Sequence, residues 1–529
     1  MEKITRFPPE PNGFLHLGHC KSIFINWASN NKCHLRLDDT NPEAEKEDFV
    51  ANIIEDIKWL GFDPGHITYT SDYFDILSKY AVLLITNDLA YVDFTSNEEI
   101  REQRHMGFEN KYRSVEVKQN LAEFEKMKNG SYAKSECVLR LKIDMQNLNH
   151  VLRDPIAYRI CSTPHHRTGS DWKIYPSYDY SHGIIDALEG ITHSYCTDEF
   201  FIRRDLYYWT PTKLIELGIN LTVAEEIEYG KLSVENNILS KRNINKLISD
   251  GHLTDYTDPR LLTIRGLRRR GFTPDLIKQI VECSGFDRKE TIISTKFMDH
   301  LLKTAYNESA IRVFGVINPL EVVIRLDELT NELPDELPDL NKCLIHPNHP
   351  FKEMGSHQIH LTNNIWIEKD DYSEKEIKGF YRFMPNNKLR LKYDNDDFYQ
   401  LVCKESIQTE SVSSESDCNK SKHKITITKA DVSGLNIKKI KGCIHWISKS
   451  EATKVIYELF TELAPNGVFD SNSIIKKIGY IQSFAKNNLD KVFQLERIGY
   501  FKFDRYEKID GEKLPVFIQI VGLFDNNKI

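Results

Sequence analysis

Residues 9–19 carry side chains whose types and spacing suit the binding of a nucleoside triphosphate. The segment, PEPNGFLHLGH, follows an expected strand and opens an expected helix. His16 and His19 lie three residues apart, so both rings project from one side of a first helical turn, where free backbone N–H groups attract anions. Gly18 has no side chain, so a flat base can approach the backbone. With the preceding turn, the pattern favours a triphosphate clamp. Without it, a surface pair or a metal site would be the commoner explanation.

The elements around this motif alternate between strands and helices. Residues 4–7 and 34–37 have strand character, whereas residues 17–28 and 43–60 have helical spacing of their apolar side chains. This order predicts a parallel α/β sheet. Asp38 directly follows the second strand, where a carboxylate could hold a ligand's ammonium group or simply cap a turn.

The second half of the chain changes in texture. Residues 260–310 are expected to be mainly helical, and from 311 onward short runs of strand-forming residues alternate with turn residues, which suggests all-β barrels. The polar segment 410–422, ESVSSESDCNKSK, is expected to be a mobile loop within the β region.

Length and composition limit the possible classes of protein. The 529 residues predict roughly three to four domains, and the net charge of −8 excludes a polycation, so any nucleic acid must meet local basic patches. The ten cysteines are scattered without zinc or redox spacing. Neither a membrane-spanning run nor a signal-peptide core is visible. We therefore expect a soluble, cytoplasmic protein with reduced thiols.

Several longer strings make the chain resemble a known family, the class I aminoacyl-tRNA synthetases, and within it the glutaminyl group. The His-x-Gly-His motif at 16–19 is the first family signature, and ILSKR at 238–242 fits the second, a Lys-Met-Ser-Lys-Ser-like loop. Alone, such a basic triplet is typical of a solvated surface. The supporting strings are TRFPPEPNG at 5–13, LRLDDTNP at 35–42, DALEGITH at 186–193 and GLRRRG at 266–271.

This resemblance implies an α/β fold with a Rossmann-like catalytic domain and two C-terminal all-β barrels. The catalytic domain would be split into 1–72 and 178–227 by an acceptor-stem-binding insertion at 73–177. A helical subdomain would span 228–310. The proximal anticodon-binding barrel would comprise 311–323 and 437–529, and the distal barrel 324–436.

The resemblance also implies a function. The chain would be an ATP-dependent ligase that activates L-glutamine as an adenylate and transfers it to glutamine tRNA, with Mg²⁺ carried by ATP. No DNA, membrane or protein-bound metal is expected, and the protein would be a monomer. The alternatives are a glutamate-charging enzyme, a non-catalytic tRNA-binding paralogue and a small nucleotidyltransferase, which would leave the β region without a role.

Site residues are carried over position by position. The catalytic residues would be His16, His19 and Lys241. The ATP site would comprise Glu10, Pro11, Asn12, His16, Leu17, Gly18, His19, Cys20, Lys21, Ser22, Thr197, Lys231, Leu232, Leu239, Ser240 and Lys241. The glutamine site would comprise Arg6, Asp38, Tyr178, His182, Cys196 and Glu226. The tRNA contacts would be Arg265, Arg268, Arg269, Arg270, Asn307, Arg312, Arg382, Lys392, Gln494 and Arg497.

Three positions bear on the choice of amino acid. Cys196 is neutral where glutamate-charging relatives place Arg, and Tyr178 can both donate to and accept from an amide. Glu226 stands where the glutamine enzymes usually have Gln, and we expect its charge to repel glutamate further. His165 and His166 have no Cys or Asp at ligand spacing, so a metal is not expected there.

Overall fold

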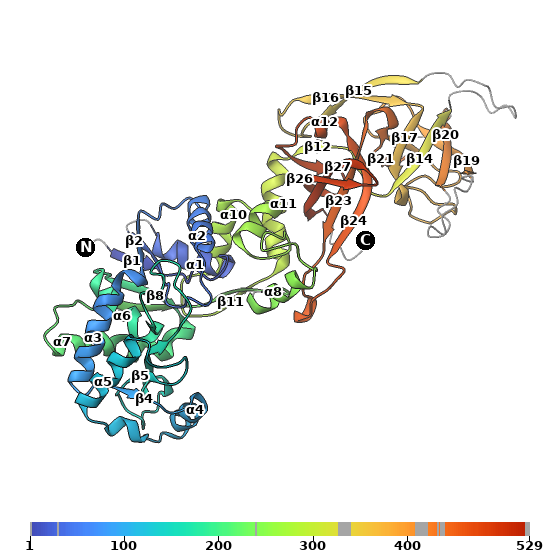
Figure 1. Ribbon diagram of the computed structural model, residues 1–529. Coiled ribbons are helices and arrows are strands. Elements are labelled where there is room, and N and C mark those ends of the chain that lie inside the picture. Colours follow the sequence, from blue (N-terminus) through green and yellow to red (C-terminus); the bar gives the residue numbers. More distant parts are fainter. Residues whose placement is uncertain are drawn as a thin grey trace, which may run out of the picture. The chain divides into compact units, whose positions relative to one another are not determined.

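The computed structural model describes residues 3–28, 31–238, 241–325, 340–407, 422–430, 433 and 440–523. The chain divides into two compact units, the first comprising 1–268 and 272–295 and the second 269–271 and 296–529. In the described residues no helix combines the length and apolarity needed to span a bilayer. Figure 1 labels the elements of both units.

The first unit is organised around parallel strands. β1 (Lys3–Phe7), β2 (Asn31–Leu37) and β3 (His66–Tyr69) pair in parallel, with α1 (Leu17–Asn26) and α2 (Glu47–Trp59) as crossovers. A second parallel pair, β8 (His193–Thr197) and β9 (Glu225–Tyr229), meets the other edge of β1, where Thr192 N donates to Ile4 O at 2.9 Å. The order is therefore β3-β2-β1-β8-β9, as expected for an α/β domain. The chain connections lead to opposite sides of the sheet on the two sides of the β1–β8 boundary. In parallel α/β sheets, ligands bind at such a point, beyond the carboxyl ends of the strands.

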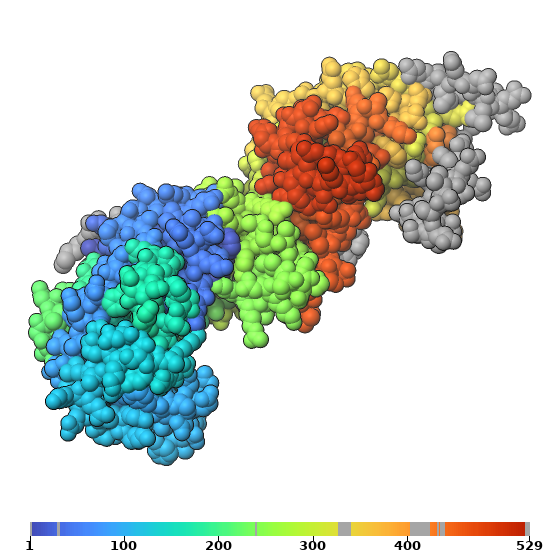
Figure 2. Space-filling model, viewed as in Figure 1, coloured from blue at the N-terminus to red at the C-terminus, as the bar shows by residue number. Residues whose placement is uncertain are grey.

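An inserted lobe separates β3 from the helix that leads to β8. Its antiparallel sheet has the order β4-β5-β6-β7, and in Figure 2 it forms the light-blue to cyan part of the first unit. Its strands are β4 (Ala90–Asp93), β5 (Val138–Leu141), β6 (Ile156–Ile160) and β7 (Ile174–Pro176), and its helices are α3 (Phe74–Thr86), α4 (Asn97–Met106) and α5 (Val117–Lys128). Buried side chains such as Leu77, Leu139 and Ile184 form one core that joins the lobe to α6 (Tyr178–Leu188). The lobe is thus packed firmly against the elements that carry the pocket.

The remaining helices follow in chain order. They are α7 (Arg204–Glu216), α8 (Lys241–Ser249), α9 (Ile264–Arg270), α10 (Pro274–Cys283) and α11 (Thr295–Ser309), and the strands β10 (Leu232–Val234) and β11 (Thr291–Ile293) pair in parallel among them. Residues 260–310 are mainly helical, as the sequence predicts.

The second unit contains two seven-stranded sheets. One has the order β12-β25-β26-β27-β23-β24-β13 and the other β21-β18-β19-β20-β14-β17-β22. In each sheet the first and last strands are successive pieces of one chain segment, 311–316 and 442–448 respectively, so each sheet closes on itself as a barrel. The expected all-β barrels are confirmed.

The strands of the first barrel are β12 (Ile311–Val313), β13 (Gly315–Val316), β23 (Ala452–Phe460), β24 (Ile474–Gln482), β25 (Val492–Leu495), β26 (Gly499–Ile509) and β27 (Glu512–Gly522), with the short α12 (Ser483–Lys486). Those of the second are β14 (Pro319–Arg325), β17 (Asn364–Glu368), β18 (Lys388–Leu391), β19 (Tyr399–Ile407), β20 (Lys422–Lys429), β21 (Gly442–Ile444) and β22 (Ile447–Ser448). β15 (Asn341–Pro347) and β16 (Ser356–Thr362) form a separate hairpin.

The division between the barrels differs from the expected one. β21 pairs with β18 and β22 with β17, so residues 442–448 belong to the second barrel and not to the segment beginning at 437. β14 pairs with β17 and β20, so residues 319–323 also belong to the second barrel and not to the expected segment 311–323. Strand pairing across the barrel decides this, and the local sequence does not reveal it. Of the expected loop at 410–422, residues 410–421 lie outside the described residues, and Lys422 begins β20.

Candidate active site

A cavity of about 710 Å³ lies in the first unit beyond the carboxyl ends of β1 and β8. Of the residues expected at the ATP and glutamine sites, those that line it are Arg6, Glu10, Asn12, His16, Gly18, His19, Ser22, Asp38, Tyr178, Cys196, Thr197, Lys231, Leu232 and Lys241. The structure therefore brings together residues spread over more than 230 positions. Pro11, Leu17, Cys20 and Lys21 are not part of the lining, and Leu239 and Ser240 lie outside the described residues.

The two histidines of the first motif are held by backbone hydrogen bonds. His16 Nδ1 accepts from Gly18 N at 3.1 Å, and His19 Nδ1 accepts from His16 N at 3.1 Å. Each proton is therefore assigned to Nε2, which leaves two N–H donors for phosphate oxygens. Burial, with help from Lys231, lowers the pKa of His16 to about 4, and burial also holds the pKa of His19 well below its usual value. Both rings are neutral donors at pH 7.

Two further features complete this end of the cavity. A Cβ at Gly18 would lie 2.9 Å from His16 Cε1, so a side chain there would displace the first histidine. Lys241 begins α8, and its Nζ lies 3.7 Å from the position a Gly13 Cβ would take and 5.6 Å from the centroid of the Phe49 ring. A cation and two N–H donors thus line one cavity, as a triphosphate requires.

Asp38 occupies another part of the cavity wall. Its side chain is 3% exposed, and Oδ1 accepts from Thr70 Oγ1 at 3.1 Å. Burial, with the nearby charge of Glu10, raises the pKa of Asp38 to about 6. An ammonium group would restore the favourable environment that the buried carboxylate lacks.

A buried network orients Arg6, and most of its members were not expected from the sequence. Asp186 accepts from Arg6 Nε at 3.0 Å, Arg36 Nη2 at 2.5 Å and Tyr207 Oη at 2.8 Å. Burial acts to raise the pKa of Asp186, but the charges of Arg6 and Arg36 outweigh it and hold the pKa below the usual range. Asp186 belongs to the DALEGITH string, but its partners are up to 180 residues away. No local signal could have revealed these contacts.

Around this network lie the remaining residues of the expected glutamine site. Arg6 Nη2 lies 2.6 Å from Ser194 Oγ and 2.5 Å from His182 Nε2, and the rings of His182 and Tyr178 stack at 4.5 Å. His182 and Glu226 line a smaller neighbouring cavity, which shares Tyr178 and Phe200 with the main one.

Cys196 and Glu226 form a direct pair. Cys196 Sγ donates to Glu226 Oε1 at 3.0 Å, and Glu226 is 5% exposed. Burial raises the pKa of Glu226 and also that of the Cys196 thiol. Glu226 Oε2 is buried without a hydrogen-bond partner in the described part of the chain. Because residue 226 is Glu where glutamine enzymes usually have Gln, a buried carboxylate oxygen without a hydrogen-bond partner among the described residues lies beside the pocket.

The expected tRNA contacts lie outside the cavity and are largely engaged within the protein. Arg265 donates to Asp56 and Glu55 at 3.1 and 2.5 Å, Arg268 to Glu55 at 3.4 Å, and Arg269 to both oxygens of Asp504. The half-exposed Arg268 is the most open of the four arginines, whereas Arg270 lies 3.6 Å from Asp299. Because these four arginines are paired with carboxylates, they do not form the free basic surface that a solvated cluster would present.

On the barrels the expected residues form two groups. Arg382 and Arg497 both contact Asp371, at 2.9 and 2.7 Å, and Lys392 donates to Glu496. Arg312 is buried and donates to Asn307, while Gln494 Oε1 has no partner in the described residues. The expected residues thus form one group of ion-paired cations and, where α11 meets the first barrel, one group of Arg312 with Asn307.

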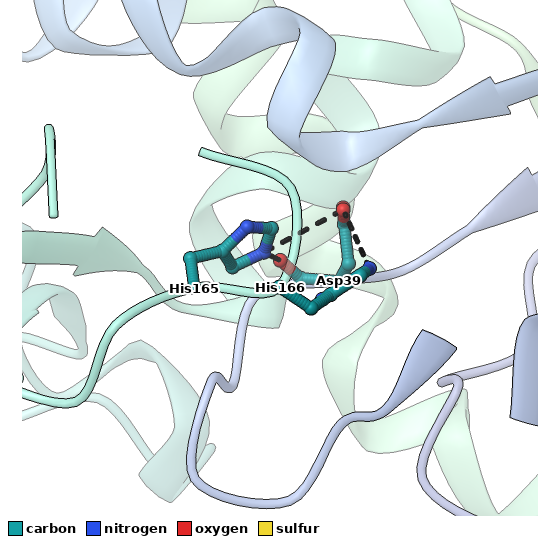
Figure 3. Close-up of side chains that lie close together, drawn as sticks. All are labelled: Asp39, His165 and His166. Atoms are coloured by element: carbon teal, nitrogen blue, oxygen red, sulfur yellow. Dashed lines mark hydrogen bonds and ion pairs between the residues drawn. The ribbon is translucent and has the colours of Figure 1, made fainter. Parts of the chain in front are cut away.

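Figure 3 shows a further cluster that the sequence spacing did not suggest. Asp39, His165 and His166 place one ligand atom each within 4.8 Å of one another, an arrangement that could hold a metal ion. The sequence offers no partner at ligand spacing near the two histidines, but the fold supplies Asp39 from the loop after β2.

Protein-family models match both the part of the chain that carries the cavity and the part that forms the barrels. A family model described as tRNA synthetases class I (E and Q), catalytic domain, matches residues 3–304. Two models for the anti-codon binding domain of the same class match 310–419 and 443–504.

Relatives of known function match over almost the whole chain. Glutamine–tRNA ligases from Neisseria gonorrhoeae and Vibrio cholerae are each 38% identical over 99% of this chain and 94% of theirs. Among solved structures, a glutamate tRNA ligase from Elizabethkingia meningosepticum has a TM-score of 0.42 at 18% identity, over 58% of this chain and 70% of that chain. The family models and the two relatives lead to one conclusion: the chain belongs to the class I tRNA synthetases of the E and Q group.

Proposed function

We propose that this chain is a glutamine–tRNA ligase. The observation that carries the choice of amino acid is the Cys196–Glu226 pair. The neutral Cys196 stands where glutamate-charging relatives place Arg, and its thiol donates to the carboxylate of Glu226. The amide NH₂ of glutamine can donate to Glu226 and Tyr178, whereas the side chain of glutamate would meet a buried negative charge. The 38% identity to glutamine–tRNA ligases supports the same choice.

The first step would join glutamine to ATP. The α-carboxylate of glutamine attacks the α-phosphorus, the bond to the bridging oxygen breaks, and pyrophosphate leaves with that electron pair. The Nε2–H groups of His16 and His19 and the ammonium of Lys241 would meet the charge that develops on the phosphate oxygens. Members of this family use ATP together with a divalent metal, which here would arrive as part of the Mg·ATP substrate.

Asp38 would hold the α-ammonium of glutamine, and Arg6 would be kept in place by Asp186 beside the side-chain end of the substrate. Orientation of this kind lowers the barrier because the reacting carboxylate is held near the phosphorus. In the second step the 2′-hydroxyl of the terminal adenosine of tRNA would attack the carbonyl carbon of the adenylate and release AMP.

The other parts of the chain would bind the RNA. We infer that the inserted lobe takes the acceptor end and that the barrels bind the splayed anticodon bases, as is usual for single-stranded RNA. Arg382, Lys392 and Arg497 are half-exposed cations that could exchange their carboxylate partners for RNA.

ATP–pyrophosphate exchange and aminoacylation, each measured with glutamine and with glutamate, with and without tRNA, test this proposal. We expect glutamine alone to be activated and charged, and exchange to require tRNA. Charging of glutamate would contradict the role of Cys196 and Glu226. Absence of exchange with both amino acids would leave a tRNA-binding protein without ligase activity.

A further inference from the structure

The inserted lobe contacts the loop that carries Asp38, and its side chains form hydrogen bonds with this loop. His165 Nε2 lies 2.9 Å from Asp39 O, Arg159 Nη2 lies 3.1 Å from Thr40 O, and Lys134 pairs with Glu43. Of these, the bond from His165 reaches the residue directly after Asp38. The backbone that aims the Asp38 carboxylate is therefore held partly from outside the nucleotide-binding sheet.

The proton of His165 can be assigned from its neighbours. His165 Nδ1 accepts from Arg167 N and Thr168 N, both at 3.2 Å, so Nε2 carries the hydrogen and donates to Asp39 O. Packing of Phe74 edge-on and Tyr175 face-on against the ring fixes its orientation. The ring is thus a rigid link between the 165–169 turn and the backbone of Asp39.

The same assignment argues against a metal ion in the Asp39–His165–His166 cluster. The Nε2 that would face the ion is already a donor, and Asp39 Oδ2 accepts from Ser71 Oγ at 2.7 Å. Arg167 Nη1 lies 4.0 Å from that same oxygen and would repel a cation. His166 differs from its neighbour, because neither of its buried ring nitrogens makes a hydrogen bond within the described residues.

We propose that His165 is a positioning residue for substrate binding: its hydrogen bond to Asp39 O aims the carboxylate of Asp38 at the α-ammonium of the amino acid. This inference rests on the proposed role of Asp38. Removing the donor would leave a buried carbonyl unpaired and allow the loop to shift, and shifts of about 1 Å are enough to weaken a charge-assisted contact severely.

The test uses two variants that separate the ring's two hydrogen-bonding roles. His165→Gln can keep a donor near the Nε2 position, whereas His165→Asn keeps only an acceptor near the Nδ1 position. We expect His165→Asn to raise the KM for glutamine about tenfold, the usual worth of one buried hydrogen bond, and His165→Gln to stay within about threefold of the wild type. His166→Leu is the matched control from the neighbouring position and should change this KM less than about twofold.

A second measurement distinguishes aiming of Asp38 from a general loss of structure. Glutaric acid monoamide is glutamine without its α-amino group and cannot contact Asp38 in the same way. Its inhibition constant, and the KM for ATP, should change less than about twofold in His165→Asn. A parallel rise in the inhibition constant, or an equal effect of His166→Leu, would overturn the proposal.

Three further outcomes bear on the two proposals. Equilibrium dialysis with Zn²⁺ alone would overturn the proposal if the wild type retained one ion that both His165→Gln and His166→Leu lost. If the wild type activates glutamate in place of glutamine, the proposed function fails, but the same comparison with glutarate still tests His165, because the α-ammonium is common to both amino acids. A wild type that activates neither amino acid would overturn both proposals.

Discussion

The cations beside the catalytic pocket and those on the barrels are paired with carboxylates in different ways. Arg6 and Arg36 are 1% exposed and surround Asp186, which is fully buried. Arg382 and Arg497 share Asp371 in a similar fork, but they are 32% and 30% exposed. Removing Asp186 would leave the arginines of the first group buried without a counter-ion or water. The arginines of the second group can be solvated again when they lose Asp371. The buried group suits a geometry set before substrate arrives, and the half-exposed group suits exchange with RNA.

The largest expected effect comes from removing the buried carboxylate. Asp186→Ala should lower the free energy of unfolding of the first unit by about 3–5 kcal/mol, because Arg6 and Arg36 lose their shared partner. The matched variant, Asp371→Ala, should cost no more than about 1 kcal/mol, because its arginines reach solvent. Urea unfolding of both variants measures this, and equal losses would remove the contrast between the two regions.

Removal of charge at Asp38 should have the next largest effect. Asp38→Asn keeps the shape of the side chain but loses its charge, so kcat/KM for glutamine should fall about 30- to 100-fold, as for a charge-assisted hydrogen bond. The KM for ATP should stay unchanged, since the histidines and Lys241 are intact. Pyrophosphate exchange with tRNA present gives both values. If the kinetic constants for glutamine and for ATP were impaired equally, Asp38 would act only by stabilising the fold.

The same carboxylate should give the enzyme an acid limb. The pKa of Asp38 is raised to about 6, so the group is ionised above pH 6 and neutral below it. kcat/KM for glutamine should therefore fall about tenfold per pH unit below that value. The KM for ATP should stay flat between pH 5 and 7, because the pKa of His16 is lowered to about 4. A change in the KM for ATP between pH 7 and pH 5 would contradict the assignment of the acid limb to Asp38.

A smaller effect is expected at Glu226. Glu226→Gln removes the buried charge and should reduce discrimination against glutamate about five- to tenfold, with the KM for glutamine within about threefold. Aminoacylation with each amino acid measures the ratio. An unchanged ratio would make Glu226 a bystander and leave discrimination to Tyr178 and Cys196.

The smallest effect is expected on the barrels. Arg497→Ala should raise the Kd for tRNA about threefold and reduce the dependence of log Kd on log salt by about 0.7 to 0.9, as for one phosphate contact. Stability should change by less than about 1 kcal/mol. Salt-dependent filter binding measures the slope. A loss of stability like that of Asp186→Ala would show that exposure is not what separates the two regions.

Local patterns were sufficient for the parts of the molecule whose geometry is set by nearby residues. The spacing of His16 and His19 predicted both on a first helical turn, and the structure has His16 as the N-cap of α1 (Leu17–Asn26) and His19 in its first turn. The strand and helix expected at 4–7 and 43–60 were found as β1 (Lys3–Phe7) and α2 (Glu47–Trp59). Turn residues and side-chain periodicity determine structure over a few residues, so their effect can be predicted from the sequence before the fold is known.

Other features depend on which distant segments meet. Asp186 joins Arg6 across 180 residues, Cys196 meets Glu226 across 30, and His165 reaches Asp39 across 126. The barrel boundary likewise depends on the pairing of β21 (Gly442–Ile444) with β18 (Lys388–Leu391). The amino-acid sequence determined the chemistry of these side chains, and only the folded chain decided their partners, because burial and long-range packing choose among many contacts that the local sequence allows equally.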